Sequence, residues 1–253
     1  MSKQNDLAKV MTGEIDQAVA VLDPMWDGVP EPVEDAPTAR VLPFANRFAA
    51  GRLLGRSLMH NAHANTVVLG IAHGGLAVAE GVAQELESKL DVWLVRKLTS
   101  VTDPSVVLGA ISEGASVVLD RESLKSAGLT SQEIRAIVKE TAEQMVEEAR
   151  RLRRGRPALS LSGKTVIIVD DGIPAGGTIA AAIDGVRRRG AVRVVVASPI
   201  GTKGAVESLS SEANEVVVLV TPPRLRRVGA WYQDFRQISD GSVMKILATS
   251  APS

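Results

Sequence analysis

Short runs of β-branched apolar residues alternate along this chain with segments of helical spacing, and this alternation limits the possible folds more than any other feature. Five such runs are present, at residues 66–71, 91–95, 165–169, 192–197 and 215–220. Strands this apolar are expected to be covered on both faces, as in parallel sheets whose connections are helices. The pattern therefore predicts an α/β fold with a parallel sheet flanked by helices.

Two of the intervening segments carry helix signals. Residues 178–189 place their apolar side chains on one stripe and are followed by Gly190, which can adopt the left-handed conformation that ends many helices. Thr130 and Glu133 have the spacing of a capping box, so a long helix is expected to begin at Thr130. We interpret residues 120–157, approximately, as a helical arm inserted into the sheet domain.

The two ends of the chain differ from this alternating region. Residues 1–41 combine weak helical spacing with a stretch rich in proline and acidic residues, which is typical of an extension or linker. The alternating pattern occupies residues 42–245, which we expect to form one domain. Residues 246–253 are expected to be a disordered tail.

The composition excludes several classes of function. Lys and Arg together number 29, as do Asp and Glu, so no overall charge attracts the chain to nucleic acid or an anionic membrane. The absence of cysteine excludes disulfides, thiolate metal sites and thiol catalysis. No apolar run approaches the ~20 residues of a membrane span, and the polar N-terminus does not resemble a secretory signal. We therefore expect a cytoplasmic protein without a membrane or nucleic-acid partner.

Five arginines gather near the end of the predicted helical arm: Arg150, Arg151, Arg153, Arg154 and Arg156. They could bind RNA, but cations at the C-terminal end of a helix are usually solvated and interact favourably with the helix dipole. We expect these five side chains to be solvated.

The sequence VIIVDDGIPAGGT, residues 166–178, joins the third apolar run to the helix that follows it. It places Asp170 and Asp171 at the carboxyl end of a strand, where open α/β sheets bind their ligands. The backbone N–H groups of the glycine turn, with the helix dipole behind them, would attract an anion such as phosphate. Two carboxylates beside a phosphate are explained if they accept hydrogen bonds from a sugar diol or hold Mg²⁺. A ribose 5-phosphate carries both groups.

The same residues also fit a plainer structure. A strand that ends in Asp-Asp-Gly before a glycine-rich turn can be a solvated turn with a helix cap. Local chemistry alone leaves the ligand site and the solvated turn equally open.

Several segments together resemble a known family. In length and order, residues 166–178 are similar to the signature with which type I phosphoribosyltransferases bind 5-phosphoribosyl 1-pyrophosphate (PRPP). Over roughly four-fifths of its length, residues 42–240, the chain resembles bacterial predicted phosphoribosyltransferases of uncertain substrate, through the segments VVLGIAHGGLAVA, LDVWLVRKL, LSGKTVIIVDDG and VGAWYQDFRQISD. The resemblance implies a type I phosphoribosyltransferase-like parallel sheet flanked by helices, with an inserted helical arm and a small C-terminal hood.

The resemblance assigns roles to the central motif. It implies that Asp170 and Asp171 contact the ribose hydroxyls of PRPP, directly or through Mg²⁺. It also implies that a loop wraps the 5-phosphate, and the residues of this loop are Ala175, Gly176, Gly177 and Thr178. Most relatives have a threonine where Ala175 stands, so one hydroxyl contact is expected to be missing while the backbone donors remain.

Two other segments are implied to hold pyrophosphate. His73, Gly74 and Gly75 follow the first predicted strand, where the family keeps its pyrophosphate loop, and paired glycines permit a close approach of the backbone. Relatives usually have arginine where His73 stands, so an imidazole replaces a permanent cation.

Arg96 and Lys97 follow the second predicted strand, where the family places cations on the same pyrophosphate. Without the resemblance, these two residues would suit a solvated strand end. Residues 98–114, rich in Thr, Ser and Gly, match the stretch that follows and are interpreted as a mobile cover over the site.

The C-terminal part supplies a candidate acceptor site. The chain has three Trp, one Tyr and three Phe, and Trp231, Tyr232 and Phe235 lie close together around Asp234. Aromatic faces and a carboxylate suit a planar heterocycle, and VGAWYQDF, residues 228–235, resembles the hood of the family. Without the resemblance, these residues favour a small aromatic core that anchors the C-terminal segment.

Together, these features predict a Mg²⁺-dependent phosphoribosyltransferase that transfers ribose 5-phosphate from PRPP to a nitrogenous acceptor and releases pyrophosphate. The expected partners are PRPP and an unidentified base-like acceptor, and the sequence is compatible with a homo-oligomer. Ala175 and His73 support an alternative function, that of a catalytically weakened regulatory protein that binds PRPP or a nucleotide.

Overall fold

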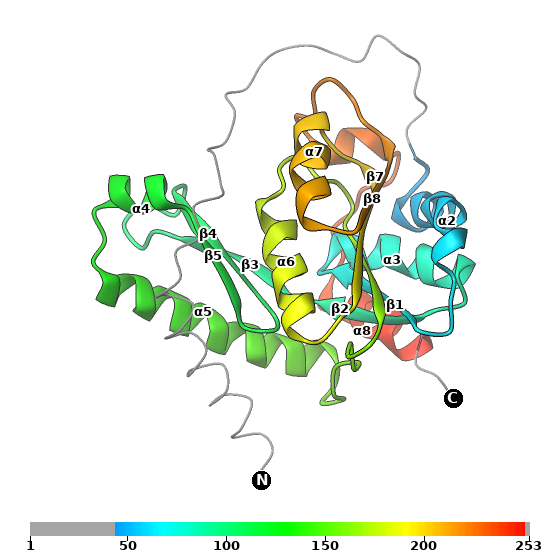
Figure 1. Ribbon diagram of the computed structural model, residues 1–253, viewed down its shortest axis with the longest axis horizontal. Helices are drawn as coiled ribbons and strands as arrows, with labels where there is room; N and C mark the ends of the chain where they lie inside the picture. Colours follow the sequence, from blue (N-terminus) through cyan, green and yellow to red (C-terminus); the bar gives the residue numbers. More distant parts are fainter. Residues whose placement is uncertain (1–43, 251–253) are drawn as a thin grey trace.

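The computed structural model describes residues 44–250, which fold into a mixed α/β structure (Figure 1). Its larger sheet has five parallel strands in the order β2-β1-β6-β7-β8. These strands are Lys89–Trp93 (β2), Thr66–Ile71 (β1), Thr165–Val169 (β6), Arg193–Ile200 (β7) and Glu215–Val220 (β8). The predicted parallel sheet is confirmed, and the predicted extension at residues 1–41 lies outside the described residues.

Two strands of the larger sheet differ from the predicted runs. β2 begins and ends two residues earlier than expected, and β7 continues to Ile200. Ile71 pairs with Trp93 at the last step of the β1–β2 ladder, so the parallel pairing stops there. Val95 instead begins a new strand, because it pairs with Ser112 in an antiparallel ladder.

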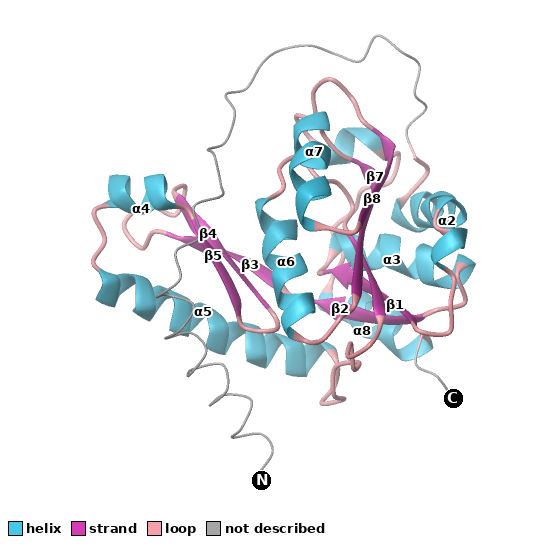
Figure 2. Ribbon diagram, in the orientation of Figure 1, coloured by secondary structure: helices cyan, strands magenta, loops and turns pink. Residues whose placement is uncertain are grey.

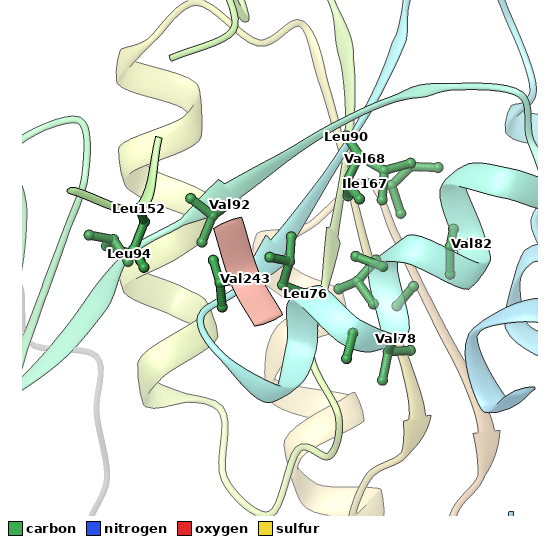
Figure 3. Close-up of a cluster of buried hydrophobic side chains, with 14 of the residues drawn as sticks. Val68, Leu76, Val78, Val82, Leu90, Val92, Leu94, Leu152, Ile167 and Val243 are labelled. Carbon is green, nitrogen blue, oxygen red and sulfur yellow. The ribbon is translucent and has the colours of Figure 1, made fainter. Parts of the chain in front are cut away.

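Helices cover both faces of the larger sheet (Figure 2). They are Arg47–Ser57 (α2), Gly74–Glu85 (α3), Gly177–Arg188 (α6), Lys203–Glu212 (α7) and Asp240–Thr249 (α8), with short 3₁₀ turns at Met59–Asn61 (η1) and Val228–Trp231 (η2). Alternate strand residues point to opposite faces, so Val68 and Ile167 lie in one core and Val67 and Ile168 in the other. Side chains of α2, α3 and α8 fill the first core, in which Figure 3 labels Leu76, Val78 and Val243, and side chains of α6 and α7 fill the second. Within residues 44–250, no helix is both long and apolar enough to cross a membrane.

A smaller sheet and two helices form an arm beside the larger sheet (Figure 1). The arm contains the antiparallel strands Val95–Thr99 (β3), Val107–Ser112 (β4) and Ser116–Leu119 (β5), followed by Arg121–Ala127 (α4) and Ser131–Leu152 (α5). α5 begins with the predicted capping box: the Thr130 hydroxyl accepts from the N–H of Glu133, whose carboxylate accepts from the N–H of Thr130.

The segment interpreted as a mobile cover, residues 98–114, is largely part of this arm. Residues 98–99 belong to β3 and residues 107–112 to β4, so the two strands form a hairpin. Leu98 and Leu108 are buried in the same core as Met145 of α5. Their apolar side chains pack against α5, and the interpretation of residues 98–114 as a mobile cover stays a prediction.

The C-terminal boundary predicted at residue 245 was also wrong. α8 continues to Thr249, and Ile246 and Leu247 are buried in the core on the α3 side of the sheet, together with Val243, which Figure 3 labels. These three residues follow the i, i+3, i+4 spacing that places side chains on one helix face. Burial of this face extends the domain beyond the expected start of the tail, and residues 251–253 lie outside the described part of the chain.

One of the arginines expected to be solvated is buried. Arg153, which follows α5, is only 5% exposed. It donates hydrogen bonds to the carboxylates of Asp91 and Glu113 and to the carbonyl oxygen of Val92. Burial by itself would lower the pKa of Arg153, but the two carboxylates outweigh it and hold this pKa above its ordinary value. The side chain thus fastens the end of α5 to β2 and to the β4–β5 turn.

Candidate functional site

The two acids of the central motif lie at the carboxyl edge of the larger sheet, directly after β6. Asp170 is half-buried, and one of its carboxylate oxygens accepts a hydrogen bond from the N–H of Asp171 at 2.8 Å. Burial and the neighbouring carboxylate of Asp171 raise the pKa of Asp170 well above its ordinary value. The two acids differ in their partners, because the Asp171 carboxylate makes an ion pair with a cation.

That cation is Arg47, the first residue of α2, which sequence reasoning did not identify. Its Nε donates to Oδ2 of Asp171 at 2.8 Å, and the arginine side chain is only 9% exposed. α2 starts here because Asn46 caps it by accepting a hydrogen bond from the N–H of Ala49. A lone arginine at a helix start, separated by 124 residues from its partner, gives no signal in a motif search.

The loop between β1 and α3 reaches the acidic pair through its glycines. A Cβ atom at Gly74 would lie 2.1 Å from Oδ2 of Asp171, and one at Gly75 would lie 2.5 Å from the carbonyl oxygen of Val169. The sequence suggested that these glycines admit a pyrophosphate. In the structure, Gly74 and Gly75 allow the loop to contact the acidic pair, because they have no side chain.

His73 precedes these glycines, and the peptide bond that joins it to Ala72 is cis. Its Nε2 lies 2.8 Å from Oδ1 of Asp240, the first residue of α8. Arg151 of α5 contacts the other oxygen of the same carboxylate at 2.8 Å. Hydrogen bonds from His73 and Arg151 lower the pKa of Asp240. The imidazole is thus held by α8 and, through Asp240, linked to the arm.

The predicted phosphate loop leads from β6 into α6. Gly176 is the N-cap residue of α6, and no side chain within residues 44–250 caps this helix. Hydrogen bonds to residues after β7 fix the loop: the N–H of Thr202 donates to the carbonyl of Ile173, and its hydroxyl donates to the carbonyl of Pro174. Ala175 is exposed, while Gly177 and Thr178 are half-buried in the first turn. This geometry leaves the N–H groups of the first turn available to an anion.

The two cations predicted to hold pyrophosphate lie in the arm. Arg96 and Lys97 belong to β3, and Arg96 makes an ion pair of 2.6 Å with Glu148 of α5. Both line a cavity of about 580 Å³ formed by β3, the loop after it and α5. Neither acid of the central motif is among the described residues that line this cavity.

A second cavity, of about 560 Å³, adjoins the acidic pair. One part of its lining consists of Arg47, His73, Gly74 and Asp171. The other part consists of Phe235, Gln237, Ile238, Ser239 and Asp240. This cavity therefore brings together the loop after β1, the second acid and the C-terminal segment, which are distant in sequence.

The hood, residues 228–235, packs directly on the central motif. Tyr232 is buried, and its hydroxyl donates to the main-chain carbonyl of Asp171 at 2.6 Å. Burial and the Asp171 carboxylate raise the pKa of Tyr232. Its ring lies against Phe44 and Phe235, at centroid distances of 5.6 and 5.1 Å. Tyr232 was predicted to meet the acceptor, but these contacts enclose its ring and make it an anchor of the hood.

The remaining hood residues divide into surface and cavity positions. Trp231 is half-buried at the end of η2 and is not among the residues that line the cavity. Asp234 pairs with Arg236 at 2.6 Å. Phe235 is the hood ring that lines the cavity, and the guanidinium carbon of Arg47 lies 3.6 Å from its centroid. The aromatic spacing located the hood but did not show which ring lines the cavity.

The acidic pair suits one kind of metal site. Among the described residues, no group of three or more His, Asp or Glu side chains could hold a metal by itself. Mg²⁺ usually binds through one or two carboxylates, water and the phosphates of a substrate. Asp170 and Asp171, next to an uncapped helix N-terminus, fit this shared type of site.

Known proteins share this architecture. The sequence profile of the phosphoribosyl transferase domain matches residues 47–221. Two curated Mycobacterium tuberculosis proteins, from strains CDC 1551 and H37Rv, are each named "putative phosphoribosyl transferase" and are 38% identical over 204 residues, or 81% of this chain. The chain spans about half the length of these relatives, 46%. The crystal structure of TT1426 from Thermus thermophilus is 37% identical, with a TM-score of 0.70 over 83% of this chain and 100% of that one.

Proposed function

This chain belongs to the phosphoribosyl transferase domain family, and we propose that it transfers the ribose 5-phosphate unit of PRPP to a nitrogen atom of a base-like acceptor. One observation carries this proposal: two carboxylates lie at the carboxyl edge of the sheet, beside a helix N-terminus that no side chain caps. A ligand that carries both a diol and a phosphate satisfies both features.

In this proposal, the loop from Ala175 to Thr178 binds the 5-phosphate through backbone N–H groups and the α6 dipole. Asp170 and Asp171 accept hydrogen bonds from the ribose hydroxyls. Asp170 and Asp171 would also hold Mg²⁺, which would offset the negative charge that gathers there. The loop of His73, Gly74 and Gly75 binds the pyrophosphate, while Arg96 and Lys97, which were also predicted to bind it, line the separate cavity of the arm.

The reaction needs no side-chain nucleophile. A bond forms between the acceptor nitrogen and C1 of the ribose as the bond from C1 to the pyrophosphate oxygen breaks. The electron pair of the broken bond stays on pyrophosphate, and the acceptor nitrogen loses its proton to solvent. The protein contributes mainly by positioning the reactants and stabilising charge.

The cavity beside Asp171 is the proposed place for the acceptor. Phe235 offers an aromatic surface there, while Gln237 and Ser239 offer hydrogen-bonding groups. Trp231 and Asp234 lie on the same hood as Phe235, and they would contact the acceptor at the rim of the cavity. The proposed acceptor is therefore a planar ring with polar edges.

A regulatory function is the second candidate. Two observations favour it: the His73 imidazole is already engaged by Asp240, and Ala175 brings no hydroxyl to the phosphate loop. A protein with these features could bind PRPP or a nucleotide without turning it over.

One assay separates the two functions. Release of pyrophosphate from PRPP in the presence of Mg²⁺ is measured with a panel of purine and pyrimidine bases, and calorimetry measures PRPP binding in parallel. We expect binding at millimolar PRPP or below, with acceptor-dependent release for at least one base. Binding without release for any base would favour the regulatory function, and no binding at all would refute both.

Replacement of Gly74 by alanine is expected to weaken PRPP binding roughly tenfold or more, because small displacements of a positioning group are costly. The added Cβ would lie 2.1 Å from Oδ2 of Asp171, so the carboxylate must move away from its position beside Arg47. Calorimetry with PRPP and Mg²⁺ measures the effect. Gly204→Ala is the matched control, because a Cβ there meets nothing within 4 Å. Equal affinities of the two variants would contradict the role of Gly74.

A further inference from the structure

Arg47 makes three contacts with two different parts of the site. Its Nε donates to Oδ2 of Asp171 at 2.8 Å, and its Nη1 donates to the carbonyl oxygen of Arg236, directly after the hood, at 2.9 Å. Its guanidinium carbon lies 3.6 Å from the ring centroid of Phe235. The edge of the guanidinium group therefore donates to an acid of the ribose site, while its face lies on the aromatic ring of the acceptor cavity.

The backbone that carries Arg47 is firmly placed. α2 packs against α3 through glycines: a Cβ at Gly51 would clash with the carbonyl oxygen of Val78, and one at Gly81 would lie 2.4 Å from the carbonyl oxygen of Phe48. The close approach of the two helices fixes the N-terminal turn of α2 relative to the loop after β1. Arg47 therefore reaches Asp171 from a rigid element.

The guanidinium group suits this combination of partners. It is planar and carries its N–H donors in fixed directions, so a carboxylate, a carbonyl and an aromatic face can be satisfied together. A lysine ammonium could replace the charge near Asp171, but it could not stack on Phe235 and bind the carbonyl of Arg236 at the same time. The arrangement uses the shape of the side chain in addition to its charge.

These contacts constrain Asp171 on both its side chain and its main chain. Arg47 occupies Oδ2, while the hydroxyl of Tyr232 binds the main-chain carbonyl of the same residue at 2.6 Å. Gly74 lies against the same oxygen, since even a methyl group at this position would meet Oδ2. Asp171 can thus present only its other carboxylate oxygen, Oδ1, to a ligand, and its orientation depends on the position of the hood.

We propose that Arg47 is a positioning residue that holds the Asp171 carboxylate and the hood in one arrangement, so that the ribose site and the acceptor cavity are assembled together. The proposal rests on the proposed function in assigning Asp171 to the ribose. Its other half, the link between Arg47 and the hood, can be tested without any substrate.

The substrate-dependent test uses Arg47→Met, Arg47→Lys and Asp171→Asn, with calorimetry of ribose 5-phosphate and of PRPP in the presence of Mg²⁺. We expect Arg47→Met to weaken both ligands at least tenfold and Arg47→Lys to recover part of the loss. Because Arg47 acts through Asp171, the double variant Arg47→Met/Asp171→Asn should bind within about twofold of Asp171→Asn alone. Additive losses would overturn the proposal.

The control is Arg52→Met on the same helix. Arg52 pairs with Glu85 at the surface, and its side chain is 48% exposed. This variant should bind both ligands as the unchanged protein does. If Arg52→Met weakens binding as much as Arg47→Met, the effect belongs to α2 as a whole and the proposal fails.

The substrate-free test measures hydrogen–deuterium exchange of the amides at residues 232–238. We expect exchange there to be at least tenfold faster in Arg47→Met and unchanged in Arg52→Met, while the amides of β1 and β6 stay protected in both. Unchanged exchange at residues 232–238 in Arg47→Met would overturn the link to the hood. If the unchanged protein binds neither ligand, the proposed function fails, and the exchange result alone decides whether Arg47 holds the hood.

Discussion

Replacement of Arg153 by methionine is expected to lower the free energy of unfolding by about 3–5 kcal/mol, the range found when one partner of a buried ion pair is removed. Arg153 donates at 2.9 Å to Asp91 and at 2.7 Å to Glu113. Asp91 is itself only 5% exposed, so the variant leaves a buried carboxylate without its cation. Methionine keeps most of the apolar stem, which restricts the change to the lost charge and donors. Denaturant unfolding followed by circular dichroism measures the loss.

A surface arginine supplies the control for this experiment. Arg188 on α6 pairs with Asp184 at 2.7 Å, and both side chains are nearly half exposed. Exposed pairs of this kind contribute at most about 1 kcal/mol, so Arg188→Met should change the unfolding free energy little. Losses of the same size in Arg153→Met and Arg188→Met would show that the buried network does not hold the arm as described.

Replacement of Asp170 by asparagine is expected to weaken PRPP binding between about tenfold and 150-fold, which corresponds to the 1.5–3 kcal/mol of a hydrogen bond to a charged group. The asparagine carbonyl can still accept the hydrogen bond from the N–H of Asp171, which is 2.8 Å long. The backbone turn is therefore expected to keep its shape while the negative charge is lost. Calorimetry with PRPP and Mg²⁺ measures the affinity.

The same variant is expected to gain stability in metal-free buffer at neutral pH. Burial and the Asp171 carboxylate raise the pKa of Asp170 above its ordinary value of 3.8, so the folded protein binds this proton more tightly than the unfolded chain does. Stability therefore falls as the pH rises from about that ordinary value towards the raised pKa. Asparagine cannot ionise, so its advantage over the unchanged protein should grow over the same interval.

The opposite directions of these two effects make the test specific. Asp184→Asn on the surface of α6 is the control, and it should leave PRPP binding and the free energy of unfolding at neutral pH nearly unchanged. An Asp170→Asn protein that binds PRPP normally would remove Asp170 from the ligand site. An Asp170→Asn protein that is less stable than the unchanged protein at neutral pH would show that favourable contacts hold the Asp170 carboxylate.

The features that sequence reasoning located correctly are those that depend on neighbouring residues. β6, the acids that follow it and the turn into α6 form one continuous segment, so an unbroken apolar run, turn residues and a helix start could be recognised in order. The capping box of Thr130 is local for the same reason. The boundaries of β2 and the C-terminal end of the domain were misplaced, because the pairing of Trp93 and the burial of Leu247 depend on distant partners.

No local pattern in the sequence indicated the contacts that join distant segments. Arg153 belonged to a run of five arginines, and nothing nearby distinguished the one that Asp91 and Glu113 bind. In the same way, three aromatic residues marked the hood, yet only packing turned Tyr232 inward and placed Phe235 on the cavity. A charged or aromatic side chain takes its role from what surrounds it, and those surroundings come from several strands and helices.

The amino-acid sequence alone therefore specified a parallel sheet and a glycine-rich turn beside two acids, because periodicity and turn propensity act over a few residues. Tertiary structure decided which acid is paired with a cation, how closely the loop at Gly74 approaches it, and where the hood lies. Arg47 shows the reason most clearly: its partner Asp171 is 124 residues away, and only the packing of α2 on α3 brings the two together.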